Sequence, residues 1–264
     1  VRRQLWAGSG GEYGKAEYNL RVIEMNQVLN HDWKDLENRK ALITAQEIQN
    51  QPKVWMKLAC VLENRKQELG TFMNKVLGIP GLRVIFTGAG SSAFVGESLM
   101  MLLGQEKGLR SETHHTTDIV ATPDAIFEDV PTLLVSYSRS GSSPESCAAI
   151  QIAQKHVKQL YNLVLVCNSD SALARLPMDP EMTKIVHIPQ EAYDQGFAMT
   201  CSVSCMSLAT WILFSGSKME ERIRSLRELA VSAEEQMPTI QQVAAKIAAW
   251  DYRRIVYLGF GALR

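Results

Sequence analysis

Short apolar runs alternate with apolar residues at helical spacing along the middle of the chain. Four runs rich in β-branched residues predict buried strands, at residues 82–86, 132–135, 163–166 and 184–188. Helical patterns separate most of these runs, notably at residues 93–103 and 145–157. Because strands and helices alternate in this way in parallel α/β sheets, an open, doubly wound parallel sheet flanked by helices is the simplest architecture.

A polar stretch and a long helix precede the first strand. Residues 1–43 show weak periodicity and are interpreted as an N-terminal extension of uncertain order. Thr44 and Glu47 have the spacing of a helix capping box, so a helix is expected to start there. Past Pro52, apolar residues recur on one stripe of that helix, at Trp55, Leu58, Leu62, Leu69, Phe72 and Val76. This stripe is typical of core packing.

Two further helices and a repeated motif follow the last strand. Residues 198–214 predict an apolar helix, and residues 218–250 predict a charged, amphipathic helix that is interrupted near Pro238. Residues 254–261 then repeat the pattern of residues 83–90, which is Arg, three apolar residues, one variable residue and Gly-x-Gly. The offset is 254 − 83 = 171 residues. The repeat predicts the start of a second copy of the domain, in a truncated form of a longer two-domain protein.

Composition and charge narrow the class of partner. The 28 Lys and Arg balance the 28 Asp and Glu, so no global positive field exists to hold nucleic acid. The five cysteines form no CxxC pair, which favours a reducing, cytoplasmic setting over a disulfide framework. No apolar stretch reaches the roughly 18 residues that a membrane span requires, so no membrane partner is expected. An anionic ligand must therefore be bound locally.

Small polar residues follow three of the predicted strands, at residues 87–92, 136–143 and 168–171. In a doubly wound sheet, ligands bind beyond the carboxyl ends of the strands, so these three loops are expected to gather at one edge. The candidate site can thus be located before its ligand is named.

The second of these loops has the features of an anion site. Pro144 suits the first helical position, which makes Ser143 the expected N-cap. The helix N-terminus and its dipole attract anions, and several serines lie beside it. An isolated Ser-Pro-Glu sequence more often means only a well-capped helix. A second small-residue turn at residues 88–92 favours the phosphate site, because two such turns can close around one phosphate.

Other chemistries fit the sequence less well. Gly88 and Gly90 begin a dinucleotide fingerprint, but Ala93 stands at its third glycine position. The adjacent His114 and His115 point apart on a regular element, which argues against shared metal ligation. The best interpretation of Cys201 and Cys205 is that they are small buried hydrophobes. Glu145 lies in the first turn of a predicted helix, where a carboxylate usually interacts with the helix dipole, so a role as general base is not expected.

The two turns resemble the phosphate-binding turns of SIS (sugar isomerase) domains, through residues 88–94 and 138–146. Residues 194–200 and 116–118 narrow the resemblance to the tagatose-6-phosphate ketose/aldose isomerases, also described as galactosamine-6-phosphate deaminase/isomerases. It covers about residues 44–264 and implies a flavodoxin-like sheet. The implied organisation is an extension (1–43), a first SIS domain (44–215), a connector helix (216–252) and the start of a truncated second SIS domain (253–264).

The resemblance also implies a site and a reaction. The implied phosphate-binding residues are Ser91, Ser92, Ser138, Arg139, Ser140 and Ser143, with Arg139 either contacting the phosphate or facing solvent. The candidate sugar contacts are Gly90, Thr117, Asp118, Phe197 and Ala198, for which a structural role fits equally well. The catalytic base is expected to be a glutamate of the second SIS domain, outside this chain.

The implied activity is aldose-ketose isomerisation of a sugar phosphate, or deamination of galactosamine 6-phosphate to tagatose 6-phosphate and ammonia. Neither needs a cofactor or a metal. The implied partners are a small-molecule sugar phosphate and further copies of the same chain, in a dimer or tetramer. Two rivals stay open: a sugar-phosphate sensor that binds ligand without turnover, and a purely structural pairing module.

Overall fold

The structure is a computed structural model that describes residues 27–259, with residues 105–107 described by their backbone only. Five parallel strands form the central sheet, in the order β4-β3-β5-β6-β7. The strands are β3 (Arg83–Gly88), β4 (Arg110–His115), β5 (Thr132–Ser138), β6 (Leu160–Val166) and β7 (Thr183–His187). The chain runs outward from β3 to β4 and then returns to β5, so the winding reverses between β3 and β5. The predicted doubly wound parallel sheet is confirmed.

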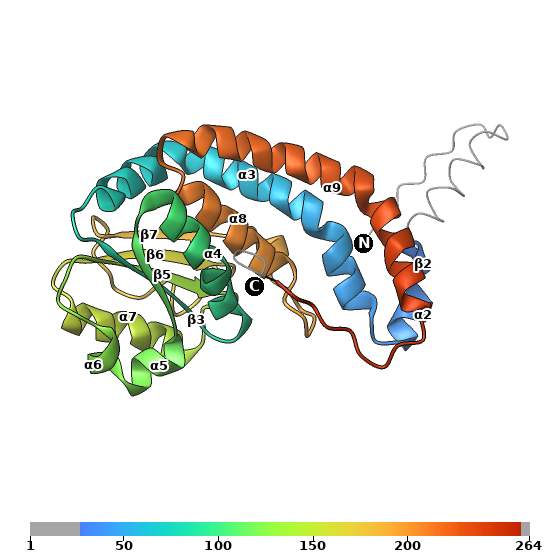
Figure 1. Ribbon diagram of the computed structural model, residues 1–264, viewed down its shortest axis with the longest axis horizontal. Coiled ribbons are helices and arrows are strands. Elements are labelled where there is room, and N and C mark those ends of the chain that lie inside the picture. The colour runs from blue at the N-terminus through green and yellow to red at the C-terminus, as the bar shows by residue number, and fades with distance from the viewer. Residues whose placement is uncertain (1–26, 260–264) are drawn as a thin grey trace, which may run out of the picture.

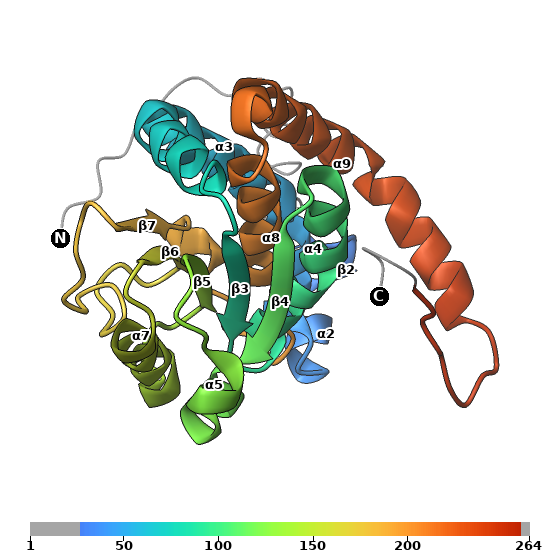
Figure 2. The same ribbon diagram turned by 60° about the vertical axis from the view of Figure 1, so that its left-hand side comes forward.

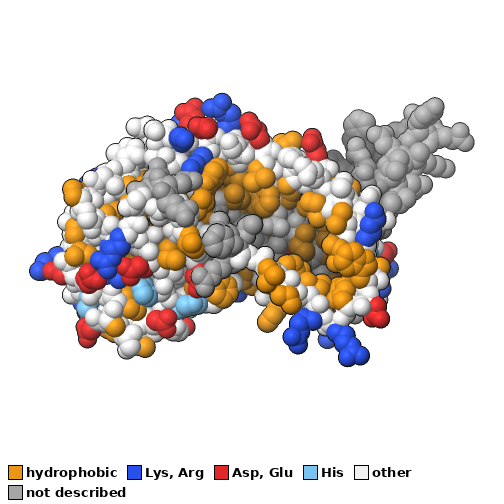
Figure 3. All heavy atoms as spheres, in the orientation of Figure 1, with side chains coloured by type: hydrophobic (Ala, Val, Ile, Leu, Met, Phe, Trp, Pro, Cys, Tyr) orange, Lys and Arg blue, Asp and Glu red, His pale blue; other side chains and the backbone are white. Residues whose placement is uncertain are grey.

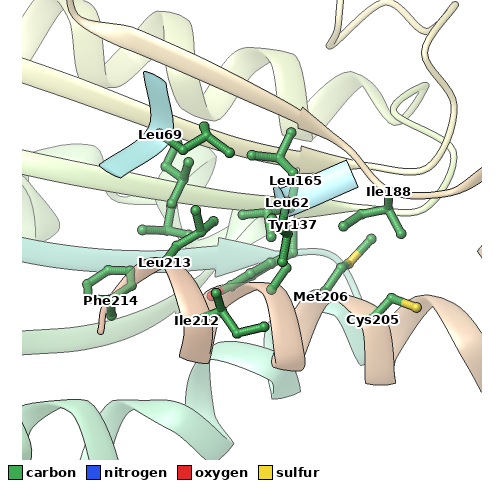
Figure 4. Close-up of a cluster of buried hydrophobic side chains, with 14 of the residues drawn as sticks. Leu62, Leu69, Tyr137, Leu165, Ile188, Cys205, Met206, Ile212, Leu213 and Phe214 are labelled. Atoms are coloured by element: carbon green, nitrogen blue, oxygen red, sulfur yellow. The ribbon is translucent and has the colours of Figure 1, made fainter. Parts of the chain in front are cut away.

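Helices cover both faces of this sheet (Figures 1 and 2). On one face lie α3 (Leu42–Leu77), α4 (Ser91–Lys107) and α8 (Cys201–Leu213), with α9 (Met219–Ala248) packed on the outside of α3. On the other face lie α5 (Thr116–Ala121), α6 (Pro123–Ile126) and α7 (Pro144–His156). The larger apolar core lies between the sheet and the first group of helices (Figure 4). The apolar stripe predicted along α3 contributes to this core.

All four predicted strands are confirmed, and β4 is a fifth that the pattern did not predict. Its sequence is Arg-Ser-Glu-Thr-His-His, without an apolar run, because it forms an edge of the sheet and is only half-buried. Polar side chains on this strand pair across the sheet instead. Glu112 accepts hydrogen bonds from Nε and Nη2 of the buried Arg83, at 2.9 and 2.6 Å.

Two helix predictions were wrong. α3 begins at Leu42 with Ala41 as its N-cap, so Thr44 and Glu47 lie inside the helix and form no capping box. α9 continues through Pro238 without interruption, just as α3 continues through Pro52. The two helices pack side by side along a shared arc (Figure 1), and this tertiary packing outweighs the hydrogen bond that each proline removes.

The ends of the described chain differ from the expected pattern. Residues 27–43 include a hairpin of β1 (Gln27–Val28) and β2 (His31–Asp32) and helix α2 (Trp33–Asn38), whereas residues 1–26 lie outside the described part. Short 3-10 turns occur at Gln190–Ala192 and Gly216–Lys218. Residues 254–259 form no regular element, and Tyr257 and Leu258 are 90% and 93% exposed. The last part of the repeat, residues 260–264, is outside the described range.

Apolar side chains are exposed on one side of the described part of the molecule. In Figure 3, apolar side chains gather around the hollowed side of the molecule between the α3–α9 arm and the sheet. On α9, Ile240, Val243 and Ile247 are exposed at helical spacing. Across residues 27–259, no helix combines the length and the apolar character needed to cross a membrane.

Candidate functional site

Two serine-containing turns lie next to each other at the carboxyl edge of the sheet. The first follows β3 at residues 88–92, and the second follows β5 at residues 138–143. β3 and β5 are hydrogen-bonded neighbours, with Gly88 in register with Tyr137. Adjacent strands lie about 4.8 Å apart. The turns therefore meet at the point where the winding of the sheet reverses, which is where such sheets bind ligands.

The first turn depends on its glycines. Gly90 has φ +57° and is the N-cap of α4, a conformation that side-chain-bearing residues rarely adopt. Gly88 packs so closely on the helix that an added Cβ would lie 2.7 Å from the Ser92 carbonyl carbon. The close packing places Ser91 and Ser92 in the first turn of α4, half-buried at the edge of the sheet.

In the second turn, two serine oxygens already accept hydrogen bonds from backbone amides. Ser138 Oγ accepts from the amide of Gly141 at 2.9 Å, and Ser140 Oγ accepts from the amide of Ser142 at 3.3 Å. A hydroxyl that accepts in this way still has its own proton to donate. The turn is therefore built to donate hydrogen bonds, as an anion site requires.

Ser143 occupies the expected N-cap position of α7, and Pro144 follows at the first helical position. The Ser143 hydroxyl does not cap a backbone amide. It pairs instead with the Ser146 hydroxyl, with 2.6 Å between the two oxygens. The geometry differs from a plain helix cap, because the Ser143 side chain leaves the helix N-terminus open.

The third polar loop, at residues 168–171, supports the second turn from behind. The amide of Asn168 donates to the carbonyl of Arg139 at 3.2 Å. Gly141 has φ +61°, and a Cβ added there would lie 2.2 Å from Ser171 Oγ. The loop that follows β6 thus fits against the turn with no space for a side chain at position 141.

Arg139 joins the second turn to the loop after β7. Its Nη1 donates to the carbonyl of Asp194 at 2.6 Å, and its guanidinium lies over the Tyr193 ring at 5.1 Å. The alternative in which Arg139 simply faces solvent is therefore wrong. Its contact with phosphate stays a prediction, and any such contact would use the guanidinium nitrogens that are not bonded to Asp194.

Two carboxylates hold this loop in place, a role that the sequence did not predict for either of them. Asp194, 1% exposed, accepts from the amides of Thr200, Cys201 and Ser202 and so closes the N-terminus of α8. Glu47 accepts from the amides of Gln195 and Gly196 at 2.6 and 2.8 Å. Glu47 is separated from them by 148 and 149 residues, so no short-range sequence signal could have revealed these contacts.

The candidate sugar contacts lie at three exposed places. Thr117 and Asp118 are in the first turn of α5, directly beyond the end of β4 and next to β3. Phe197 and Ala198 lie in the loop before α8, and the Phe197 side chain is fully exposed. Gly90 is exposed at the first turn itself. None of these five residues is needed to fill the core, so each is accessible to a ligand.

The remaining candidate groups form other contacts. His114 lies 3.2 Å from Glu112 and His115 lies 3.6 Å from Glu97, on opposite faces of β4. No cluster of three metal-ligating side chains occurs among the described residues. Burial raises the pKa of the Cys201 thiol to about 12, with the nearby Asp194 carboxylate adding to the shift, so this thiol stays protonated.

Known proteins that resemble this chain agree with the fold described above. The sequence model of the SIS domain family matches residues 81–216. D-galactosamine-6-phosphate deaminase AgaS of Shewanella sp. (strain ANA-3) is 34% identical over 236 residues, covering 85% of this chain and 58% of that protein. The chain thus spans little more than half the length of this curated relative.

Two solved structures are similar along most of the chain. A Clostridium novyi structure, provisionally described as a tagatose-6-phosphate ketose/aldose isomerase, is 35% identical with a TM-score of 0.82, covering 89% of this chain and 60% of that one. Tagatose-6-phosphate ketose/aldose isomerase from Escherichia coli is 31% identical with a TM-score of 0.76, covering 83% and 59%.

Proposed function

The chain belongs to the SIS domain family, and from that premise we propose that residues 44–215 form the phosphosugar-binding domain of a sugar-phosphate isomerase or deaminase. The most direct support is the second serine turn. The hydroxyl oxygens of Ser138 and Ser140 accept hydrogen bonds from backbone amides, so each hydroxyl can still donate its proton to an anion. The proposed phosphate ligands are the hydroxyls of Ser91, Ser92, Ser138, Ser140 and Ser143, together with the free end of Arg139.

The proposed substrate is galactosamine 6-phosphate. A general base removes the C2 proton of the open-chain aldose, and the electron pair forms a C1–C2 double bond as the C1 carbonyl becomes an enol. Return of a proton to C1 gives an imine at C2. Water adds to this imine and displaces ammonia, leaving tagatose 6-phosphate. With an aldose phosphate that lacks the amine, the same proton transfer ends as an aldose-ketose isomerisation.

In this proposal the serine turns bind the phosphate, and the catalytic base lies in another domain. Glu145 is the one carboxylate in the first turn of α7, where it suits the helix dipole. We place the base in a second SIS domain that begins at residue 253, consistent with the repeat of residues 83–90 at residues 254–261. The phosphate anchor contributes binding energy and position remote from the reacting carbons.

Two further parts of the proposal concern assembly and setting. The exposed stripe of Ile240, Val243 and Ile247 on α9 supports a homo-oligomer, a dimer or a tetramer, because exposed apolar stripes commonly mark contact surfaces. The five cysteines, all free, support a reducing cytoplasmic setting. Sedimentation of the chain at several concentrations would test the assembly.

A coupled assay would test the activity. Galactosamine 6-phosphate is added to the protein extended to the full length of its relatives, and released ammonia and tagatose 6-phosphate are measured together. Equal amounts of both products are expected. Tight binding of the sugar phosphate without either product would favour the sensor, and no binding at all would refute the proposed site.

A further inference from the structure

Two hydroxyls directly beneath the serine turns are buried without a protein partner. Thr87 on β3 is 1% exposed and Ser136 on β5 is 4% exposed. In the described part of the chain, neither the Thr87 nor the Ser136 hydroxyl oxygen has a hydrogen-bond partner. A third hydroxyl of this kind, on Thr116, follows the end of the neighbouring strand β4. Buried orphan hydroxyls thus occur at the carboxyl ends of three adjacent strands.

Thr87 and Ser136 face each other on the same side of the sheet. They are register partners in the β3–β5 pair. Each lies two residues after an apolar residue, Ile85 or Leu134, whose side chain packs toward α5 and α7. Side chains two apart on a strand share a face, so both hydroxyls point to the side covered by α7.

An unpaired hydroxyl in this position is costly. Leaving a buried hydroxyl without a partner costs about 1–3 kcal/mol, whereas an apolar group of the same shape avoids the penalty. Their neighbours on this face of the sheet, Ile85, Leu134 and Val164, are apolar and fully buried. Valine and alanine would fit this environment better than Thr87 and Ser136, unless something other than protein binds the two hydroxyls.

The neighbouring side chains are small. α7 packs Ser146 and Ala149 against the sheet, at 4% and 0% exposure. The Ser146 hydroxyl already pairs with that of Ser143 at the edge of the second turn. Ser138, two residues beyond Ser136, lies on the same face. The orphan hydroxyls are therefore one layer below the hydroxyls proposed to bind the anion.

We propose that Thr87 and Ser136 bind an ordered water molecule beneath the serine turns, and that this water is a fixed part of the anion site. A buried water typically makes about three hydrogen bonds. Thr87 and Ser136 provide two, and we assign the third to the Ser146 hydroxyl, which is buried on the face of α7 that covers this side of the sheet. The water then holds Ser146 so that it donates to Ser143, which leaves the Ser143 proton for the anion. Thr87 and Ser136 are positioning residues that do not contact the ligand. The role at the anion site rests on the proposed function.

The test combines a variant with a matched control. T87V/S136A keeps the shape of both side chains nearly unchanged and removes both hydroxyls. The control is Thr132→Val, because Thr132 is also fully buried on β5 but its hydroxyl donates to the Val130 carbonyl at the opposite end of the strand. Binding of inorganic phosphate and galactosamine 6-phosphate is measured by calorimetry, and stability by urea unfolding.

We expect T87V/S136A to bind phosphate about tenfold more weakly than the unaltered chain while staying folded. Thr132→Val should lose stability but bind phosphate with unchanged affinity. Thr87→Ser, which keeps the hydroxyl, should bind as the unaltered chain does. A double variant that is more stable than the unaltered chain and binds phosphate equally well would overturn the inference.

A high-resolution crystal structure of the ligand-free chain tests the water directly. Density for a water within hydrogen-bonding distance of both oxygens is expected, and its absence would refute the inference whatever the affinities. Failure of the unaltered chain to bind any phosphate would refute the proposed function. The water itself would still be judged by the crystal structure, so the two failures are distinguishable.

Discussion

At the residue scale, the serines of the second turn are distinguished by what each hydroxyl already contacts. The Ser140 hydroxyl oxygen accepts a hydrogen bond from the Ser142 amide, whereas the hydroxyl of the exposed Ser142 donates to the Ser140 carbonyl. Only the first of these two hydroxyls has a proton left for a ligand. The side chains differ in role although they are the same residue two positions apart.

The serine assignment leads to a binding prediction. Ser92→Ala and Ser140→Ala should each weaken binding of galactosamine 6-phosphate by tenfold or more, because a hydrogen bond to a charged group contributes about 1.5–3 kcal/mol. Calorimetric titration measures the effect. Ser142→Ala serves as the control and should bind normally. Unchanged affinity in a variant that combines Ser92→Ala with Ser140→Ala would remove the basis of the phosphate site.

Gly141 gives a second prediction at this scale. Gly141→Ala should destabilise the chain by more than the roughly 1–2 kcal/mol of a left-handed conformation, because the new Cβ also meets Ser171. Phosphate binding should fall with it. Gly81→Ala is the control, since Gly81 has φ +71° with nothing within 4 Å. Equal losses in urea unfolding for both variants would show that Ser171 contributes nothing.

The pair of Arg83 and Glu112 predicts a pH dependence of stability. The Arg83 hydrogen bonds lower the pKa of the Glu112 carboxyl from 4.5 to about 2, against the opposing effect of its partial burial. Because the pKa is depressed in the folded state, the stabilisation is complete above pH ~4.5 and is lost as the pH falls toward 2. The loss should reach about 3 kcal/mol at most.

Urea unfolding between pH 7 and pH 2 measures this dependence. Glu112→Gln should flatten the acid part of the curve. The exposed Glu128, which pairs with Arg110 at 2.8 Å, provides the control, and Glu128→Gln should leave the curve nearly unchanged. An identical acid slope in the two variants would contradict the assignment to Glu112.

At the scale of elements, the sequence predicted the buried strands and the helices between them, because apolar runs and helical spacing report burial. β4 escaped detection, since an edge strand with Glu112 and His114 on one side needs no apolar run. The helix start at Thr44 was wrong for a different reason. Glu47 contacts a loop that is distant in sequence, and local spacing cannot distinguish that contact from a cap.

Pro238 inside α9 leads to a stability prediction. Pro238→Ala should stabilise the chain by up to about 3 kcal/mol, since it restores a helical amide and removes a steric conflict with the preceding turn. Pro123→Ala is the control, because Pro123 begins α6, where no amide partner is lost. Thermal unfolding compares the two variants. A destabilised Pro238→Ala would mean that the arc along which α9 packs on α3 depends on Pro238.

At the scale of the whole molecule, the predicted gathering of three loops was confirmed, because strand order in a doubly wound sheet follows from few alternatives. Strand order does not determine which loop residues approach a ligand. Phe197 and Asp118 are exposed, and their role as sugar contacts stays a prediction. Loop positions depend on long-range contacts such as that of Arg139 with Asp194, which leave no periodic signal.

We propose that phosphate binding and the catalytic base belong to different domains, which leads to a prediction for the 264-residue chain itself. It should bind galactosamine 6-phosphate but release no ammonia, because the base is proposed to lie in the second SIS domain. Calorimetry and the ammonia assay on the same preparation provide the measurement. Turnover by this chain would show that a base lies within it and would refute the two-domain account of the reaction.

The position of the two turns on β3 and β5 has an evolutionary consequence. The segment that connects them begins with α4, which carries Ser91 and Ser92, and then passes through β4, α5 and α6 at the rim of the sheet. Within it, the exposed positions of α5, such as Thr117 and Asp118, contribute nothing to the core and can vary between lineages while both corners keep their structure. In the proposed site the two corners hold the phosphate, so new sugar preferences can arise by substitution at this rim without rebuilding the corners.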